Sequence, residues 1–119
     1  TLLLVPKGFR VYTGEDGLLL PSLAVGAYGV VSVASHVVGR QMAALIAAFV
    51  AGKSDEAARL HRELYAINKA LFLQANPVPL KAALKLIGFD AGGLRLPLTE
   101  ASPEVVGKLK EALSALGLA

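Results

Sequence analysis

The sequence contains no cysteine and no tryptophan, and only one methionine. Without cysteine the chain has neither a disulfide framework nor a thiolate metal site, which is typical of proteins in a reducing cytosol. We therefore expect a cytoplasmic protein. The two histidines, His36 and His61, lie far apart and have no carboxylates at ligand spacing. We expect no metal site.

Charge of one sign is not concentrated anywhere in the chain. Lysine and arginine together number 12 against 9 acidic residues, which gives a net charge of +3. The basic residues are not interleaved with aromatic side chains, as they would be on a nucleic-acid-binding face. We therefore expect no nucleic-acid partner. Arg59, Arg62 and Lys69 are expected on a solvated helix face.

Charged residues are absent between Gly17 and Gly39, a length that would suffice to cross a bilayer. Pro21, Gly26 and Gly29 interrupt this stretch, and the valines after Gly29 change its period. We predict a helix, a turn and a strand, with a transmembrane span as the less favoured alternative, and no membrane partner. The start, Thr1–Pro6, lacks a basic leader, so we expect the end of a helix whose beginning is absent.

Two segments have the residues of β-strands. Phe9–Thr13 alternates apolar and polar residues, and Val30–Val33 is apolar on both faces, like a strand buried inside a parallel sheet. Between them an apolar helix follows Glu15 and Asp16, whose charge suits a helix start better than a catalytic carboxylate pair. The order strand, helix, strand predicts a parallel βαβ unit.

The rest of the sequence predicts amphipathic helices with glycine stops. Ser54, Asn76 and Ser102 are the expected N-terminal caps. A turn is expected at Asp90–Gly93 and an extended segment at Leu94–Leu98. The predicted helices cover residues 38–49 before Gly52, 54–71, 76–87 before Gly88, and 102–116 before Gly117.

The predicted helices and strands are too few to enclose the predicted parallel sheet. Two parallel strands leave two open edges, and parallel strands this apolar belong to larger α/β folds covered on both faces. Hydrophobic residues make up 55% of the chain, above the roughly 45–50% of ordinary soluble proteins. We therefore predict that the chain is part of a barrel and that other protein covers its excess apolar surface.

Four segments resemble, in order and spacing, the C-terminal part of the dihydrodipicolinate synthase family within the class I aldolases. They are Gly14–Asp16, Gly29–Val33, Asn76–Ala83 and Leu94–Leu98. The resemblance covers essentially the whole chain. It distinguishes this family from its sister aldolases mostly through Asn76–Pro79.

The resemblance implies the C-terminal part of a (β/α)₈ TIM barrel followed by a helical C-terminal extension, an α/β fold. Residues 1–52 would form the last two β/α units, with strands seven and eight. Residues 53–119 would form the extension packed on the barrel. The first six strands would lie outside this sequence.

The resemblance also implies a chemistry. Pyruvate forms a Schiff base with a lysine on the sixth strand, and the enamine attacks aspartate semialdehyde on the way to diaminopimelate and lysine. Burial suits a lysine to this role because it favours the neutral, nucleophilic amine. That lysine and a proton-relaying tyrosine would precede Thr1, so we expect no catalytic residue here, an inactive isolated chain and no cofactor. The alternatives are an N-acetylneuraminate lyase, a 2-keto-3-deoxy sugar acid aldolase, or a non-catalytic helical interaction domain.

Two residues are implied substrate-binding positions. Val31 matches the eighth-strand residue whose backbone carbonyl lies beside pyruvate, and Gly14 matches a glycine that leaves room for substrate. From the residues alone, Val31 would be a core valine and Gly14 a turn glycine chosen for its φ angle. Lys81 and Lys85, four apart on a helix, are expected at the surface and not as the Schiff-base lysine.

The resemblance further implies a homo-oligomer, a tetramer, that pairs through the helix region around Val25. An exposed aliphatic side chain there would account for part of the apolar excess. His36 follows the eighth strand, where we expect a capping or solvated role, and His61 is expected at the surface.

Overall fold

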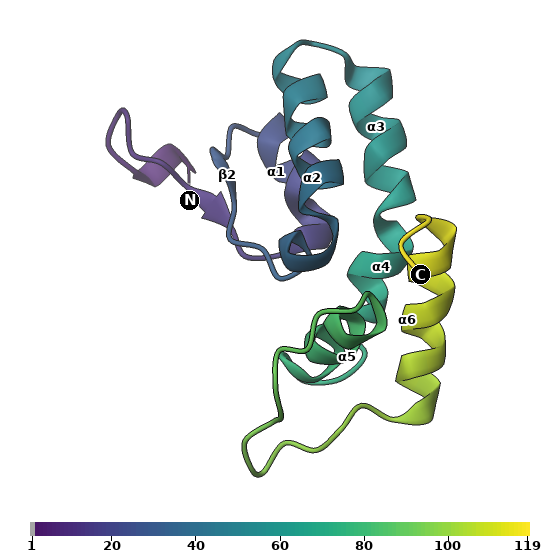
Figure 1. The fold of residues 1–119 in the computed structure, drawn as a ribbon. Coiled ribbons are helices and arrows are strands. Elements are labelled where there is room, and N and C mark those ends of the chain that lie inside the picture. Colours follow the sequence, from purple (N-terminus) through teal and green to yellow (C-terminus); the bar gives the residue numbers. More distant parts are fainter. Residues whose placement is uncertain (1) are drawn as a thin grey trace.

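The computed structural model describes residues 2–119, which form a mostly helical molecule around a short sheet (Figure 1). A helix end is predicted at residues 1–6. Residue 1 lies outside the described residues, and Leu2–Leu4 form a short 3₁₀ turn. The elements are η1 (Leu2–Leu4), β1 (Tyr12–Thr13), η2 (Asp16–Leu18), α1 (Leu19–Ala24), β2 (Gly29–Val30), α2 (Ser35–Val50), α3 (Ser54–Glu63), α4 (Tyr65–Ala70), α5 (Val78–Leu86) and α6 (Pro103–Ala115).

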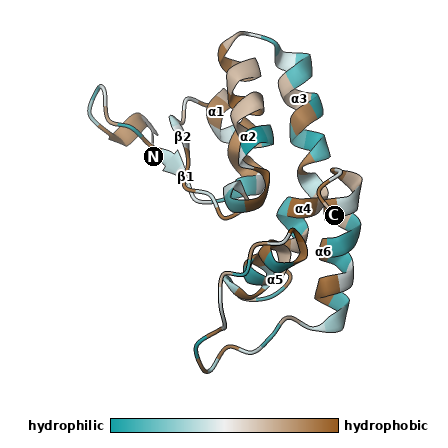
Figure 2. Ribbon diagram, viewed as in Figure 1, coloured by the Kyte–Doolittle hydropathy of each residue, from teal (hydrophilic) through white to brown (hydrophobic). Residues whose placement is uncertain are grey.

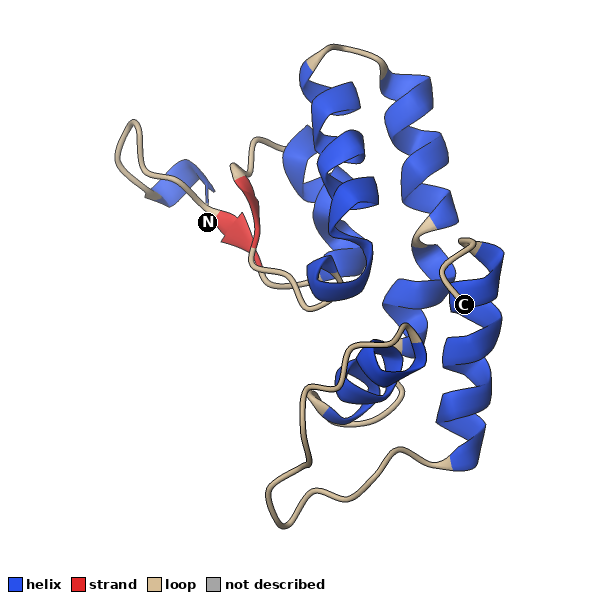
Figure 3. Ribbon diagram, viewed as in Figure 1, coloured by secondary structure: helices blue, strands red, loops and turns tan. Residues whose placement is uncertain are grey.

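The predicted βαβ unit is confirmed. Strands β1 and β2 pair in parallel, with Tyr12 opposite Gly29 and Thr13 opposite Val30, and α1 lies between them in the chain (Figure 3). Both strands are shorter than the predicted Phe9–Thr13 and Val30–Val33. Each has a single neighbouring strand among the described residues, so the regular ladder ends where that pairing ends.

The valine segment is predicted to be buried by a larger sheet, and the elements of this chain alone do not cover it. Val31 is 72% exposed, and Phe9, Tyr12 and Tyr28 are exposed on or beside the strands. The rings of Tyr12 and Tyr28 meet edge to face with centroids 5.5 Å apart, and the Arg10 guanidinium lies 4.3 Å from the centroid of the Tyr28 ring. The helices of this chain therefore leave much of the strand region uncovered.

The core lies among the helices. Helices α2 and α3 run side by side and are joined by a tight turn, in which Gly52 has a φ of +73°, while α4, α5 and α6 form a second group (Figure 1). Hydrophilic residues follow much of α3 and α6 (Figure 2), as expected for helices with one face toward solvent. The largest fully buried apolar side chains are Leu19, Leu45, Leu64, Ile67, Leu71, Leu109 and Leu113.

The predicted helix over residues 54–71 is two helices. Leu64, whose ψ is −7°, separates α3 from α4, and its side chain is only 2% exposed. Ser54 is not a cap, because it is the first residue of α3 and the N-cap position belongs to Lys53. Helix boundaries depend here on packing around Leu64, which the apolar period of the sequence does not reveal.

Two further caps were predicted, of which one is confirmed. Asn76 is not a cap, because Pro77 occupies the N-cap position of α5 and makes no side-chain bond. Pro79 lies in the first turn and has no N–H to offer a capping side chain. Ser102 does cap α6, since its hydroxyl oxygen accepts from the Val105 amide at 3.3 Å.

The uncharged stretch of residues 17–39 contains several elements. It passes through α1, a turn at Gly26, β2 and the first residues of α2, as the helix, turn and strand prediction required. Gly26 has a φ of +98°, in the left-handed region that favours glycine. Among residues 2–119, no helix is both long enough and apolar enough to cross a bilayer.

Candidate functional site

The two predicted binding residues follow the two strands. Gly14 comes directly after β1, and Val31 comes directly after β2. Because the strands are parallel, their carboxyl ends meet at the same edge of the sheet. The Val31 amide donates to the Thr13 carbonyl at 2.9 Å and so ties the two chain segments together at that edge.

Gly14 has no conformational reason to be glycine in this chain. Its φ is not in the left-handed region, so the interpretation of Gly14 as a turn glycine chosen for its φ angle is wrong. A Cβ atom built on Gly14 would meet no atom within 4 Å among the described residues. The space beside this residue is open.

Val31 is held by its backbone and leaves its side chain exposed. The interpretation as a core valine concerns the interior of a complete barrel, and within this chain 72% of the residue is accessible. On its C-terminal side the chain turns into α2 through Ser32, whose hydroxyl oxygen accepts from the Ser35 amide at 2.8 Å. The backbone of Val31 therefore lies between two hydrogen-bonded points.

Asp16 is the site residue that the sequence interpretation missed. Its carboxylate is only 1% exposed, and Oδ2 accepts from the amides of Val33 at 3.0 Å and Ala34 at 2.9 Å. Asp16 therefore begins η2, as a helix-start residue, and also bonds the start of α2. The prediction for Glu15 is confirmed, since its exposed carboxylate accepts from the Gly17 amide at 3.3 Å.

The sequence offered one signal for Asp16. It is the last acidic residue before a long uncharged stretch, and buried strands and helices in such a stretch need polar partners at their ends. Its partners are 17 and 18 residues away, so no local spacing rule connects them.

A cleft of about 460 Å³ opens between η2 and α4, next to the Gly14 loop. It combines a carboxylate, an ammonium group and two aromatic rings on its wall. Asn68 is 6% exposed, and its Oδ1 has no hydrogen-bond partner among the described residues. The cleft is lined by Glu15, Gly17, Leu18, Tyr65, Asn68, Lys69 and Phe72.

Lys81 is not the free surface lysine that was predicted. It is half-buried, and its Nζ donates to the carbonyls of Ala91 at 3.1 Å, Gly92 at 3.5 Å and Gly93 at 2.6 Å. The Lys81 amine is therefore held against the loop after α5 and does not point into an open pocket at the strand ends. Lys85 is exposed, as predicted.

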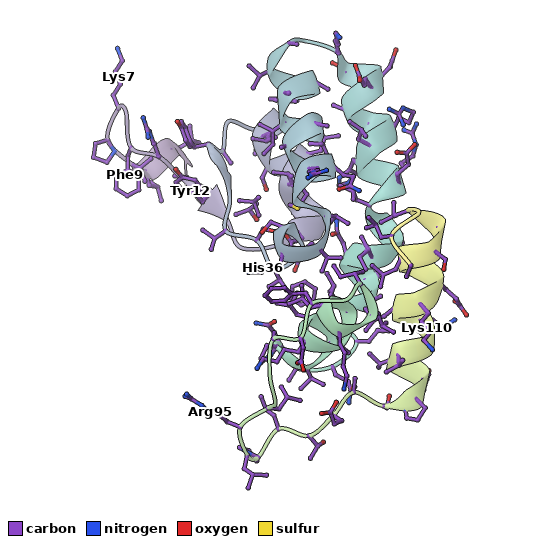
Figure 4. All side chains as sticks on the ribbon, in the orientation of Figure 1. Lys7, Phe9, Tyr12, His36, Arg95 and Lys110 are labelled. Carbon is purple, nitrogen blue, oxygen red and sulfur yellow. The ribbon has the colours of Figure 1, made fainter. Side chains whose placement is uncertain are left out.

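The two histidines lie on different helices, His36 on α2 and His61 on α3. His36 is exposed in the first turn of α2 (Figure 4), in agreement with a solvated role, whereas His61 is half-buried and not fully at the surface. Within residues 2–119 no group of three or more histidine, cysteine or acidic residues could hold a metal ion. Arg59, Arg62 and Lys69 are exposed, as predicted, and Arg59 pairs with Glu63 at 2.6 Å.

Residues 1–116 match the dihydrodipicolinate synthetase family, and the chain belongs to that family. Among curated relatives, the 4-hydroxy-tetrahydrodipicolinate synthase of Synechococcus elongatus is 54% identical over 115 residues, which are 97% of this chain and 38% of the relative. That of Moorella thermoacetica is 50% identical over 113 residues, 95% of this chain and 39% of the relative. The chain thus spans about two fifths of the length of these relatives.

Solved structures agree with this assignment. The 4-hydroxy-tetrahydrodipicolinate synthase of Methylacidiphilum fumariolicum SolV is 42% identical with a TM-score of 0.92, over 98% of this chain and 39% of that chain. The chloride-inhibited dihydrodipicolinate synthase of Acinetobacter baumannii, complexed with pyruvate, is 30% identical with a TM-score of 0.86, over 93% of this chain and 38% of that chain. The resemblance drawn from the four sequence segments is therefore confirmed.

Proposed function

We propose that this chain is the C-terminal portion of a Schiff-base-forming lyase that condenses pyruvate with aspartate semialdehyde on the route to diaminopimelate and lysine. Residues 1–52 supply the last two β/α units of a (β/α)₈ barrel, and residues 53–119 supply the helical extension. The observation that carries the proposal is the family match combined with a two-stranded parallel sheet whose outer edges have no partner strand among the described residues. Parallel sheets of this kind occur inside larger α/β folds.

In this proposal the chain forms one wall of the pyruvate pocket. Catalytic groups of such barrels lie at the carboxyl ends of the strands, where Gly14 and Val31 are found. The open space beside Gly14 gives room for the substrate, and the Val31 carbonyl faces pyruvate and the lysine amine. The relative complexed with pyruvate supports pyruvate as the donor substrate.

The Schiff-base lysine belongs to the part of the protein that precedes Thr1. Lys81 does not serve, because its ammonium group is bound by the carbonyls of Ala91, Gly92 and Gly93. Lys85 does not serve either, because it lies exposed on α5 and not at the end of a strand. The pocket is therefore completed by residues outside this chain. The proposal also places the enzyme in the cytoplasm.

The test is borohydride trapping of the full-length protein with pyruvate, followed by mass spectrometry of its peptides. We expect one reduced pyruvate adduct, on a lysine outside residues 1–119, and none in a control without pyruvate. An adduct on Lys81 or Lys85 would overturn the assignment. The acceptor is decided by comparing turnover with aspartate semialdehyde and with sugar aldehydes, and faster turnover with sugar aldehydes would place the protein among the sister aldolases.

A further inference from the structure

We propose that Asp16 is a positioning residue for the pyruvate pocket, because its carboxylate links the loop that carries Gly14 to the turn that carries Val31. The inference rests on the proposed function, since it concerns the same pocket. It assigns a role to a buried carboxylate that the Schiff-base chemistry itself does not use.

The geometry places Asp16 across the pocket edge. It follows Gly14 by two residues, and its Oδ2 receives the amides of Val33 and Ala34, two and three residues after Val31. The Thr13 carbonyl receives the Val31 amide from the other side. The peptide unit that carries the Val31 carbonyl is therefore held between β1 and Asp16, and its direction is set by both.

The electrostatics favour this arrangement. Asp16 is only 1% exposed, so its two bonds to amides are little weakened by water. The amides belong to the start of α2, where the helix dipole attracts negative charge. A shift of the carboxylate would therefore move the Val31 turn with it.

The second carboxylate oxygen indicates a role beyond folding this chain. Oδ1 of Asp16 is buried and has no hydrogen-bond partner among residues 2–119. A buried acceptor without a donor costs stability, so the surroundings of Asp16 are incomplete within residues 2–119.

The experiment uses the full-length protein with Asp16→Ala, Asp16→Asn and the control Asp55→Ala. Asp55 is an exposed carboxylate in the first turn of α3, and the 16 residues of α2 separate it in the chain from the strand ends. All variants are assayed at a temperature at which circular dichroism shows them folded. We expect Asp16→Ala to lower kcat/KM for pyruvate by about 10- to 100-fold. A loss of this size is expected when the backbone at Val31 shifts by about 1 Å.

The conservative variant separates positioning from stability. Asp16→Asn keeps an oxygen that accepts both amides, so its kcat/KM should be at least about tenfold higher than that of Asp16→Ala. The kcat/KM of Asp55→Ala should match that of the wild type. If Asp16→Ala does not fold, Asp16→Ser replaces it, and the same loss is expected because serine is too short to reach both amides.

The outcomes distinguish this inference from the proposed function. A wild-type protein that traps no pyruvate contradicts the proposed function, and with it the pocket that Asp16 would shape. A wild-type protein that traps pyruvate, with Asp16 variants that unfold at lower temperature but keep kcat/KM, contradicts the role of Asp16 alone. Equal losses in Asp16→Ala and Asp16→Asn would also contradict it, because the bonds to Val33 and Ala34 would then not be the cause.

Discussion

Gly14 and Asp16 lie two residues apart and have opposite parts in the pocket edge that we propose. Gly14 contributes open space, because neither its backbone conformation nor its neighbours in this chain prevent a side chain. Asp16 contributes a fixed carboxylate that bonds two amides of another loop. The resemblance pointed to Gly14, whereas Asp16 was missed because its partners are distant in sequence.

Gly14→Ala tests the first of these contributions. The fold should accept the methyl group, and loss of backbone freedom in the unfolded chain should leave stability unchanged or raise it by up to about 1 kcal/mol. In the full-length enzyme the same methyl group should enter the space for pyruvate and lower kcat/KM at least about tenfold. Steady-state kinetics and thermal melts measure the two effects.

Gly107→Ala is the matched control for this substitution. Gly107 lies inside α6, and a Cβ atom there would also meet nothing within 4 Å. Alanine should stabilise the helix by up to about 1 kcal/mol and leave activity unchanged. If both alanine variants keep full activity, Gly14 does not border the substrate.

At the scale of elements, the segment between α5 and α6 shows which features local sequence can predict. The turn at Asp90–Gly93 is confirmed, since Asp90 accepts from the Gly92 amide at 2.9 Å. The extended segment Leu94–Leu98 is predicted wrongly, because the Leu98 amide donates to the Arg95 carbonyl at 3.0 Å and closes a turn, with Arg95 at the outer tip (Figure 4). Turn and capping residues act on near neighbours and are visible in the sequence.

Side-chain bonds between elements were not predictable in the same way. Lys81 holds the residue 91–93 segment from α5, and Gln74 accepts from the Ser102 amide at 3.0 Å, 28 residues away. The sequence shows a lysine on a helix and a glutamine in a loop, both of which are usually solvated. Only the fold brings their partners within reach.

Lys81→Met should therefore destabilise the loop between α5 and α6. The variant removes the donors that bind three carbonyls, and we expect a loss of about 1–3 kcal/mol in the free energy of unfolding. Amide hydrogen exchange of residues 90–93 in the full-length protein should accelerate. Lys85→Met, at an exposed position on the same helix, should change stability by less than about 0.5 kcal/mol, and equal effects of the two substitutions would contradict the bonds assigned to Lys81.

At the scale of the whole molecule, the exposed apolar residues mark where other protein is needed. Leu3 is 99% exposed and Val31 72%, and Leu96, in the loop between α5 and α6, is 89% exposed. The periods of the sequence predicted the βαβ unit and most helices correctly. They did not predict the strand lengths, because a strand extends only as far as its neighbours pair with it.

Val25 is the residue that we propose for contact between subunits, and it is 72% exposed near the end of α1. In a tetramer that pairs through this region, Val25→Asp should place unpaired charge in an apolar interface and shift the full-length protein toward smaller species. Sedimentation velocity measures the shift. Val50→Asp, at a valine that is 78% exposed at the end of α2, is the matched control and should leave the assembly intact. Unchanged assembly in Val25→Asp would remove this region from the interface.

The most direct measurement is a crystal structure of the full-length protein after borohydride has reduced the Schiff base between its lysine and pyruvate. We predict that β1 and β2 are neighbouring strands of a closed eight-stranded barrel, with Gly14 and the Val31 carbonyl within about 4 Å of the trapped pyruvate. The trapped lysine should come from a strand that precedes residue 1. Pyruvate bound far from these two residues, or strands β1 and β2 outside a barrel, would contradict the account.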